Sequence, residues 1–175
     1  MSDAMLAALV DETMKRSAIV WLEYDGSGWP RGAWYVWHEG AAYVVSGGDE
    51  QLLPDIERAQ RVVVTARAKD SRERVVSWIA RAATIAPRTD EWQVAVGVLR
   101  PQRLNAVGAD QLVDRWAEHS TITRLEPTGE VPEGPGAYQS GSLAAAPVPS
   151  PATTIGRLPP VIHRRQRRAP DLHAH

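Results

Sequence analysis

The chain has 175 residues, 43% of them hydrophobic, and carries a formal net charge of −1 at pH 7 without a single cysteine. This length supports one domain with a substantial core, and the lack of cysteine excludes disulfides, thiolate catalysis and cysteine metal sites. No apolar run approaches the ~20 residues of a membrane span, and the N-terminus is acidic where a signal peptide is positively charged. We therefore expect a cytoplasmic protein without membrane contact.

The charge is divided unevenly along the chain. Residues 132–175 hold five Arg against Glu133 and Asp171, which leaves 15 basic and 19 acidic residues in residues 1–131. A folded part with a negative balance does not suit nucleic-acid binding. Residues 132–175 are rich in Pro, Ala and Arg and lack hydrophobic periodicity. The composition therefore predicts one domain over residues 1–131 and a disordered tail over residues 132–175.

The first part of the chain predicts a helix and then a strand. Asp3 is suited to cap a helix from Ala4 to about Arg16, in which apolar residues recur every three or four positions. Ser17–Tyr24 is an apolar run typical of a strand, and the Gly-rich stretch after it predicts a loop.

A β-hairpin is expected to follow this loop. Bulky side chains alternate on both faces of an extended Arg31–His38, Glu39-Gly40 supplies a turn, and Ala41–Ser46 returns as an apolar strand. The hairpin ends in Ser46-Gly47-Gly48. A glycine pair at a strand end lets backbone N–H groups approach a phosphate, and a flexible turn without a ligand explains the same residues.

The remaining segments complete a sheet with helices at its edges. They are strands at Arg61–Ala68 and Arg74–Ala86, a helix that begins at Thr89 or Asp90 and ends near Pro101, a helix that begins at Asp110, and a last strand at Thr121–Pro127. The first five strands are expected to form a meander. Sequential antiparallel strands with helices at the edges predict the α+β class, as a six-stranded antiparallel split β-barrel with flanking helices.

Common catalytic and metal-binding motifs do not occur in the sequence. GxSxG and GxxxxGK[ST] are both absent, and His38 and His119 have no patterned carboxylate or second histidine nearby, so no catalytic residue or metal ligand is assigned. Arg31, Lys69 and Arg74 are more informative, because they stand near strand ends around the hairpin. Cations beside backbone N–H groups recognise phosphate, and ordinary charges at the rim of a barrel give the same pattern.

The order of the elements, with RxxWxxWHxGxxYVVSGG at the hairpin and RVxVTxRxKD at the next strand, resembles the split-barrel flavin-binding superfamily of pyridoxamine 5'-phosphate oxidase. The sequence looks closest to an actinobacterial branch of that superfamily, and the resemblance covers about Met5 to Pro127. It implies a homodimer with FMN, or the deazaflavin coenzyme, in a groove between subunits. It also implies an oxidoreductase that acts on a small-molecule substrate.

The resemblance also assigns residues to the cofactor. Arg31 matches the hairpin Arg that reaches the flavin phosphate, Ser46 matches the Ser or Thr that ends the next strand, and Arg74 matches a polar residue that contacts the cofactor. Together with their neighbours, the candidate cofactor-binding residues are Arg31, Ser46, Gly47, Gln51, Lys69 and Arg74.

The sequence departs from the family pattern in two places. Gln51 and Leu52 stand where the oxidase has an Arg-Lys pair that clamps the phosphate, and acidic Asp49 and Glu50 precede them. The substrate-binding Arg and His at the C-terminus of the oxidase are also unmatched, so we do not expect vitamin B6 oxidation. The alternative function is a split barrel that holds another ligand, or none, and serves as a binding or structural protein.

Overall fold

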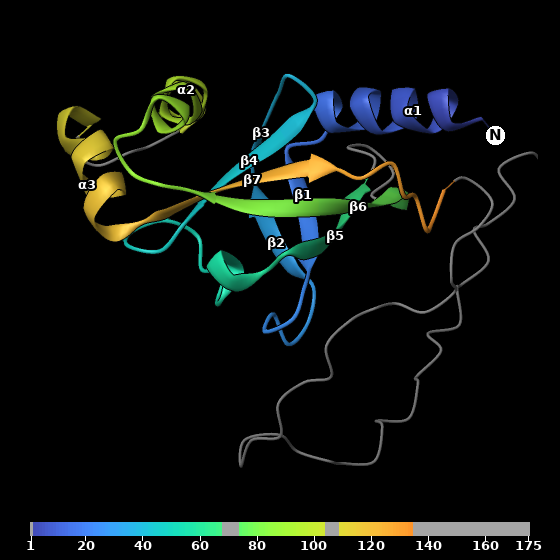
Figure 1. Cartoon of the computed structure of the whole chain (residues 1–175), viewed down its shortest axis with the longest axis horizontal. Helices are drawn as coiled ribbons and strands as arrows, with labels where there is room; N and C mark the ends of the chain where they lie inside the picture. The colour runs from blue at the N-terminus through green and yellow to red at the C-terminus, as the bar shows by residue number, and fades with distance from the viewer. Residues whose placement is uncertain (1, 68–73, 104–108, 135–175) are drawn as a thin grey trace, which may run out of the picture. The chain divides into compact units, whose positions relative to one another are not determined.

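The structure is a computed structural model that describes residues 2–67, 74–103 and 109–134 (Figure 1). Lys69 and the expected tail from residue 135 onward lie outside the described residues. The helices are α1 (Asp3–Arg16), α2 (Asp90–Leu99) and α3 (Leu112–His119), with short 3-10 turns η1 (Ile56–Arg58), η2 (Arg100–Gln102) and η3 (Ala109–Gln111). The strands are β1 (Ile19–Glu23), β2 (Arg31–Trp34), β3 (Val36–His38), β4 (Ala41–Ser46), β5 (Arg61–Arg67), β6 (Arg74–Ile85) and β7 (Thr121–Pro127).

The strands form one antiparallel sheet that nearly closes on itself. Its order is β2-β1-β5-β6-β7-β4-β3. The two edge strands, β2 and β3, are separated in sequence by Tyr35 alone. A sheet whose two edges are consecutive pieces of one strand is a barrel, and closure protects both edges from unwanted pairing. The α+β split barrel expected from the sequence is therefore confirmed.

The barrel has seven strands in the described part where the sequence predicted six. The single strand expected over Arg31–His38 is divided at Tyr35, so β2 pairs with β1 while β3 pairs with β4. Hydrophobic alternation continues through the break, because inward and outward side chains still alternate there. Local pattern therefore does not reveal the point at which a strand leaves one neighbour for another.

The β3–β4 hairpin forms as predicted, whereas the meander is wrong at one connection. Glu39 and Gly40 both have positive φ, at 47° and 75°, and His38 pairs directly with Ala41. This is the geometry of a two-residue hairpin turn. The next connection does not continue the meander, because β4 pairs with β7 and β5 pairs with β1.

The helix termini follow ordinary capping chemistry, with one correction. Ser2, rather than Asp3, caps α1, because its Oγ accepts the N–H of Met5 at 3.4 Å and Asp3 lies in the first turn. Thr89 caps α2 as expected, since its Oγ1 accepts the N–H of Trp92 at 3.2 Å. Among the described residues, none of the helices is both long and apolar enough to cross a membrane.

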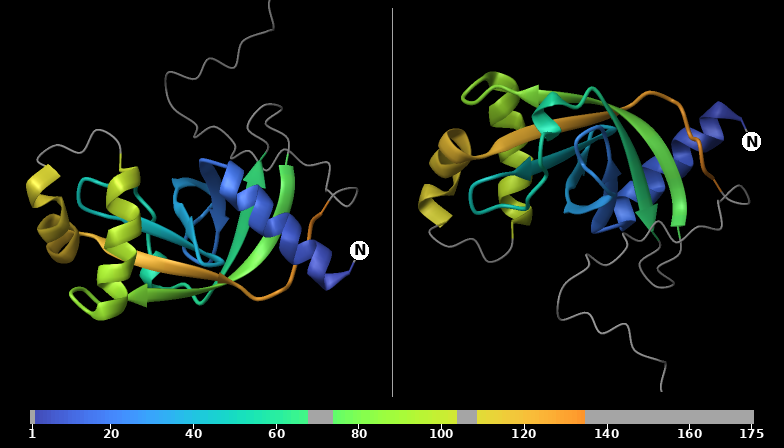
Figure 2. Two further views of the ribbon diagram at one scale, coloured as in Figure 1. Left: turned by 90° about the horizontal axis from the view of Figure 1, so that it is seen from above. Right: turned by 90° about the horizontal axis from the view of Figure 1, so that it is seen from below.

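Two apolar cores lie on opposite sides of the barrel wall. Val10 and Met14 of α1 pack with the interior of the barrel around Val64 and Trp78. Trp92 of α2 and the equally buried Trp116 of α3 pack against the outer face of β4 and β7. Figure 2 shows α1 at one end of the sheet and α2 with α3 at the other. The wall is therefore covered by helices on part of its outer face only.

Candidate functional site

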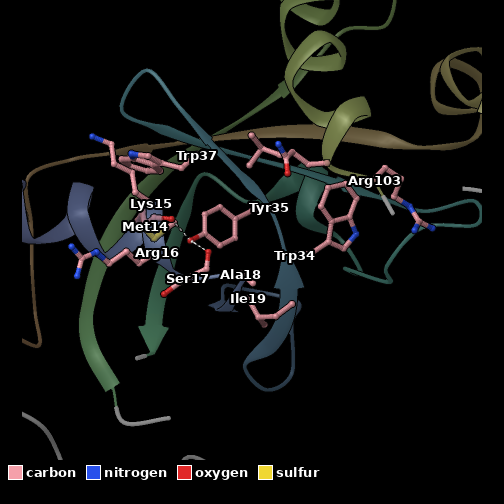
Figure 3. Close-up of a pocket in the computed structure, with 12 residues that line it drawn as sticks. Met14, Lys15, Arg16, Ser17, Ala18, Ile19, Trp34, Tyr35, Trp37 and Arg103 are labelled. Atoms are coloured by element: carbon pink, nitrogen blue, oxygen red, sulfur yellow. Dashed lines mark hydrogen bonds between the residues drawn. The ribbon is translucent and has the colours of Figure 1, made fainter. Parts of the chain in front are cut away.

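A groove of about 680 Å³ lies between the C-terminal end of α1, the start of β1, the β2–β3 break and η2. The residues with the most distinctive chemistry along it are Lys15, Arg16, Trp34, Tyr35, Trp37 and Arg103. Figure 3 shows Trp37 with Lys15 and Arg16 on one side of the groove and Trp34 with Arg103 on the other. The groove therefore combines aromatic surface with positively charged groups.

Trp37 and Tyr35 are held in place by contacts behind the groove. Trp37 donates its Nε1–H to Oδ1 of Asp11 at 2.8 Å and meets Trp78 edge to face, with ring centroids 6.0 Å apart. The Tyr35 hydroxyl lies 2.6 Å from the carbonyl oxygen of Met14 and 2.9 Å from that of Ser17. Burial raises the pKa of the Tyr35 hydroxyl, which stays protonated as a donor. Both rings are thus fixed before any ligand arrives.

The backbone of Trp34 is held in place by the side chain of Gln51. The Gln51 carboxamide accepts the Trp34 N–H at 2.8 Å and donates to the Trp34 C=O at 2.9 Å, as a neighbouring strand would. This side chain replaces the ladder that β2 loses at the break. The backbone of Gln51 is engaged as well, because its C=O accepts the N–H of Gly47 at 3.1 Å.

The three cations that line the groove already have carboxylate partners. The pairs are Lys15 with Asp11 at 2.6 Å, Arg16 with Glu12 at 2.5 Å, and Arg103 with Glu50 at 2.8 Å. The hydrogen bond from Lys15, followed by that from Trp37, lowers the pKa of Asp11. The first two pairs are exposed on α1, so they hold these cations only weakly.

Glu50 is a buried anchor between the β4–β5 connection and the helices. Only 3% of its side chain is exposed. Its carboxylate accepts Arg103 Nε at 2.8 and 3.1 Å and Trp116 Nε1–H at 2.8 Å. Glu50, which precedes the Gln51-Leu52 departure from the expected phosphate-binding pair, is thus paired inside the protein and does not line the groove.

The structure brings some of the predicted site residues together and separates others. Ser46, Gly47 and Gln51 are adjacent, since Ser46 and Gln51 form a bridge at the end of β4. Arg31 is at the far end of β2 from Trp34, where its Nε donates to the C=O of Ser27 at 3.1 Å. Lys69 and the side chain of Arg74 lie outside the described residues, so the assignment of these six residues to a cofactor stays a prediction.

The glycine pair after β4 has a packing explanation in the structure. Gly47 and Gly48 have positive φ, and a Cβ on either would come within 3.3 Å of the His119 carbonyl oxygen. The N–H of Gly47, which the sequence offered to a phosphate, donates within the loop. The alternative to a phosphate site, a turn without a ligand, therefore accounts for both glycines.

The part of the outer face of β1 next to the groove is apolar, and no helix of the described residues packs on its exposed side chains. Ile19 is 49% exposed and Trp21 37% exposed, and both side chains project outward from β1. The neighbouring position on β2 is Gly32, directly paired with Trp21. Arg67 of β5 extends over the other side of Trp21, with its guanidinium carbon 5.2 Å from the ring centroid.

The described histidines do not form a metal site. His38 lies beside Tyr43, with ring centroids 6.4 Å apart, and His119 lies at the end of α3. Among residues 2–67, 74–103 and 109–134, no three His, Asp or Glu side chains are grouped as metal ligands.

The sequence did not identify the groove itself. Lys15 and Arg16 were only the last turn of a helix, and Arg103 followed a proline with no motif around it. The signal that was available is the density of aromatic residues in Trp34–Trp37, because such residues favour ligand sites as well as cores.

Comparison with known proteins supports the fold assignment. No family model matches the chain, and no curated protein matches it. Among solved structures, the heme storage protein HutZ from Vibrio cholerae aligns with a TM-score of 0.50 and 14% identity, over 67% of this chain and 87% of HutZ.

Two other solved structures align at similar levels. A putative pyridoxamine 5'-phosphate oxidase from Listeria innocua has 12% identity and a TM-score of 0.47, over 70% of this chain and 94% of its own. The flavocytochrome Anf3 from Azotobacter vinelandii has 15% identity and a TM-score of 0.44, over 87% and 85%. The split-barrel fold that the sequence resemblance predicted is shown by the order of the strands in the sheet and is shared with HutZ.

Proposed function

We propose that the protein binds a flavin, either FMN or the deazaflavin coenzyme, in the groove beside Trp34 and Trp37 and acts as an oxidoreductase on a small molecule. The observation that carries this proposal is the pairing of fixed aromatic rings with cations in a groove of about 680 Å³. Ligand sites of small molecules have volumes of about 300 to 1,000 Å³ and are mostly apolar with a few polar groups. A planar ring with an anionic chain fits this description.

The residues of the groove would bind and orient the ligand. A bound flavin supplies hydride transfer, so no side chain has to act as an acid or a base. Trp34 and Trp37 offer apolar surface to a ring; Gln51 holds the backbone of Trp34, and Asp11 holds the indole of Trp37. Lys15 and Arg16 form exposed ion pairs with Asp11 and Glu12 on α1, and such pairs contribute little to stability.

The groove suits a flavin better than haem. Haem iron needs an axial ligand such as His, Cys, Met or Tyr. None of the described groove residues is a histidine, Met14 is buried, and the Tyr35 hydroxyl is hydrogen-bonded to two carbonyl oxygens. HutZ is described as a heme storage protein, but the described residues of this groove offer no free axial ligand of these types.

The proposal includes a homodimer in which a second copy covers the outer face of β1. Ile19 and Trp21 are exposed there, and Gly32 leaves the indole of Trp21 accessible. Because Ile19 also lines the groove, a partner on this face would enclose the cofactor between the two subunits. Trp21→Asp should then give a monomer by light scattering at micromolar concentration, whereas Val94→Asp, an exposed residue on α2, should leave the dimer intact. A wild-type monomer would remove this part of the proposal.

A second candidate is a split barrel that binds another ligand without redox chemistry. The N–H of Gly47, which the sequence offered to a phosphate, and the side chain of the candidate cofactor residue Gln51 are both engaged within the protein. This observation favours a weaker requirement for phosphate than in the oxidase.

The visible spectrum of the purified protein separates these candidates. We expect bound flavin absorption, or saturable quenching of tryptophan emission when FMN or deazaflavin coenzyme is added, because two indoles line the groove. Wild-type protein that binds neither cofactor at about 100 μM would refute the oxidoreductase proposal. It would leave the cofactor-free split barrel as the better interpretation.

A further inference from the structure

Arg67 differs from the other cations around the groove, because it has no carboxylate partner among the described residues. Its Nε is buried there without a hydrogen-bond acceptor. The side chain is half-buried on the outer face of β5, with the guanidinium over the ring of Trp21. A buried N–H without an acceptor is unfavourable, and a small shift of the guanidinium toward an anionic ligand oxygen would remove that cost.

The cations that line the groove differ from Arg67 in their ion pairing. Lys15, Arg16 and Arg103 are each matched by a carboxylate, so the groove itself has no excess positive charge. Arg67 offers a permanent positive charge, in a planar geometry suited to phosphate or carboxylate, without a competing carboxylate in the described part of the chain.

Arg67 adjoins the groove through its neighbours. Ser17, which lines the groove, donates its Oγ–H to the C=O of Arg67 at 2.9 Å. Ile19, another lining residue, lies beside Trp21 on the same outward face of β1. A Cβ placed on Gly32 would be 3.9 Å from both Ile19 and the Trp21 ring. An apolar surface therefore continues from the groove to the guanidinium of Arg67.

We propose that Arg67 binds the anionic group of the groove's ligand, while the ring of that ligand lies against the aromatic residues inside. The ligand class is then a planar aromatic ring that carries a phosphate or carboxylate on a short chain. Trp21 holds the guanidinium by a cation–π contact, so the anion site is built before the ligand binds. This inference rests on the flavin proposal and adds the residue that recognises the charge.

The test compares FMN with riboflavin, which has the same ring without the phosphate. Full-length wild type, Arg67→Ala and Arg67→Lys are titrated with each compound and followed by tryptophan and flavin fluorescence. We expect Arg67→Ala to weaken FMN binding about ten-fold or more and riboflavin binding by less than about two-fold. Arg67→Lys should recover part of the FMN affinity, because it keeps the charge and loses the fork geometry.

Arg100→Ala is the matched control, because Arg100 also has no ion pair in the described part and lines a different hollow beside α2. It should leave both affinities unchanged. Equal weakening of FMN and riboflavin in Arg67→Ala would mean a structural role and would overturn the inference, as would no change in either. If Arg67→Ala fails to fold, the same comparison is made with Arg67→Gln. Wild type that binds riboflavin and FMN equally refutes the inference and leaves the flavin proposal standing, whereas wild type that binds none of FMN, riboflavin and the deazaflavin coenzyme refutes both.

Discussion

Replacement of Glu50 should destabilise the protein far more than replacement of its neighbour Asp49. Glu50 is 3% exposed and accepts hydrogen bonds from Arg103 and Trp116, whereas Asp49 is 90% exposed and lies 4.0 Å from Arg115. The two residues are adjacent acids in the same loop. They differ in burial and partners, so the pair isolates the contribution of the buried contacts.

The magnitude of the Glu50→Ala effect follows from the groups it leaves behind. The buried Nε1–H of Trp116 would lose its acceptor, which costs about 1 to 2 kcal/mol. The Arg103 guanidinium would lose its carboxylate, and because a quarter of that side chain is exposed, water limits this cost to about 1 to 2 kcal/mol. We expect a loss of about 3 kcal/mol and a fall in Tm of about 10 °C.

Urea and thermal unfolding of wild type, Glu50→Ala and Asp49→Ala measure this difference. Asp49→Ala should lie within about 0.5 kcal/mol of wild type, as surface substitutions usually do. Glu50→Gln should fall between the two, because its amide oxygen can still accept one hydrogen bond. A free energy of unfolding for Glu50→Ala within about 1 kcal/mol of Asp49→Ala would show that the buried pair does not anchor the loop.

Three further predictions follow from other contacts. Gln51→Ala should lower the free energy of unfolding by about 2 kcal/mol, because the N–H and the C=O of Trp34 lose their hydrogen bonds to the Gln51 side chain. Gln93→Ala, at an exposed position, should change it little, and equal unfolding curves for the two variants would contradict this prediction. Asp11→Asn should be less stable than wild type at neutral pH, and this difference in stability should vanish as the pH falls below about 4. The reason is that the pKa of Asp11 is lowered in the folded protein, so its carboxylate contributes stability above its ordinary pKa that is lost on protonation. A difference independent of pH between 7 and about 2 would exclude the Lys15 pair as its source. A chain that stops after Gly134 should keep the wild-type Tm, whereas a fall of several degrees would show that residues beyond 134 are packed.

The elements were predictable from sequence wherever one local period decided the structure. Thr121–Pro127 forms a strand with the expected bounds, and Thr89 caps α2, because alternation and capping depend on a few neighbouring residues. The barrel was expected, but the strand break that closes it was not predictable. Closure depends on a break at Tyr35, and the contacts that stabilise the break come from α1 and from Gln51, both distant in sequence.

The site was harder to predict than the fold for the same reason. The family pattern drew attention to Ser46 and Gly47. In the structure, Ser46 forms a bridge with Gln51, and the N–H of Gly47 donates to the C=O of Gln51. The residues that form the groove come from α1, the β2–β3 break and η2, which no single stretch of sequence unites. In the sequence, Glu50 was only one of two acidic residues before Gln51, and the long-range contact with Trp116 identifies it as an internal anchor.

The boundary of the folded domain can be located more finely with a pair of truncations. Beyond β7, the chain continues along β6, where Ser77 N–H donates to the C=O of Glu133 at 2.8 Å and Ser77 Oγ donates to its carboxylate at 3.2 Å. A stop after Val131 removes these bonds and leaves the buried Ser77 short of partners, at a cost of about 1 to 2 kcal/mol. A stop after Gly134 retains them. The chain ending at 131 should therefore melt several degrees below the chain ending at 134, and Glu133→Ala in the longer chain should reproduce only the part due to the carboxylate. Equal melting temperatures for the two truncations would mean that the edge of β6 is satisfied by water, and the domain would then end at residue 131 as composition alone predicts.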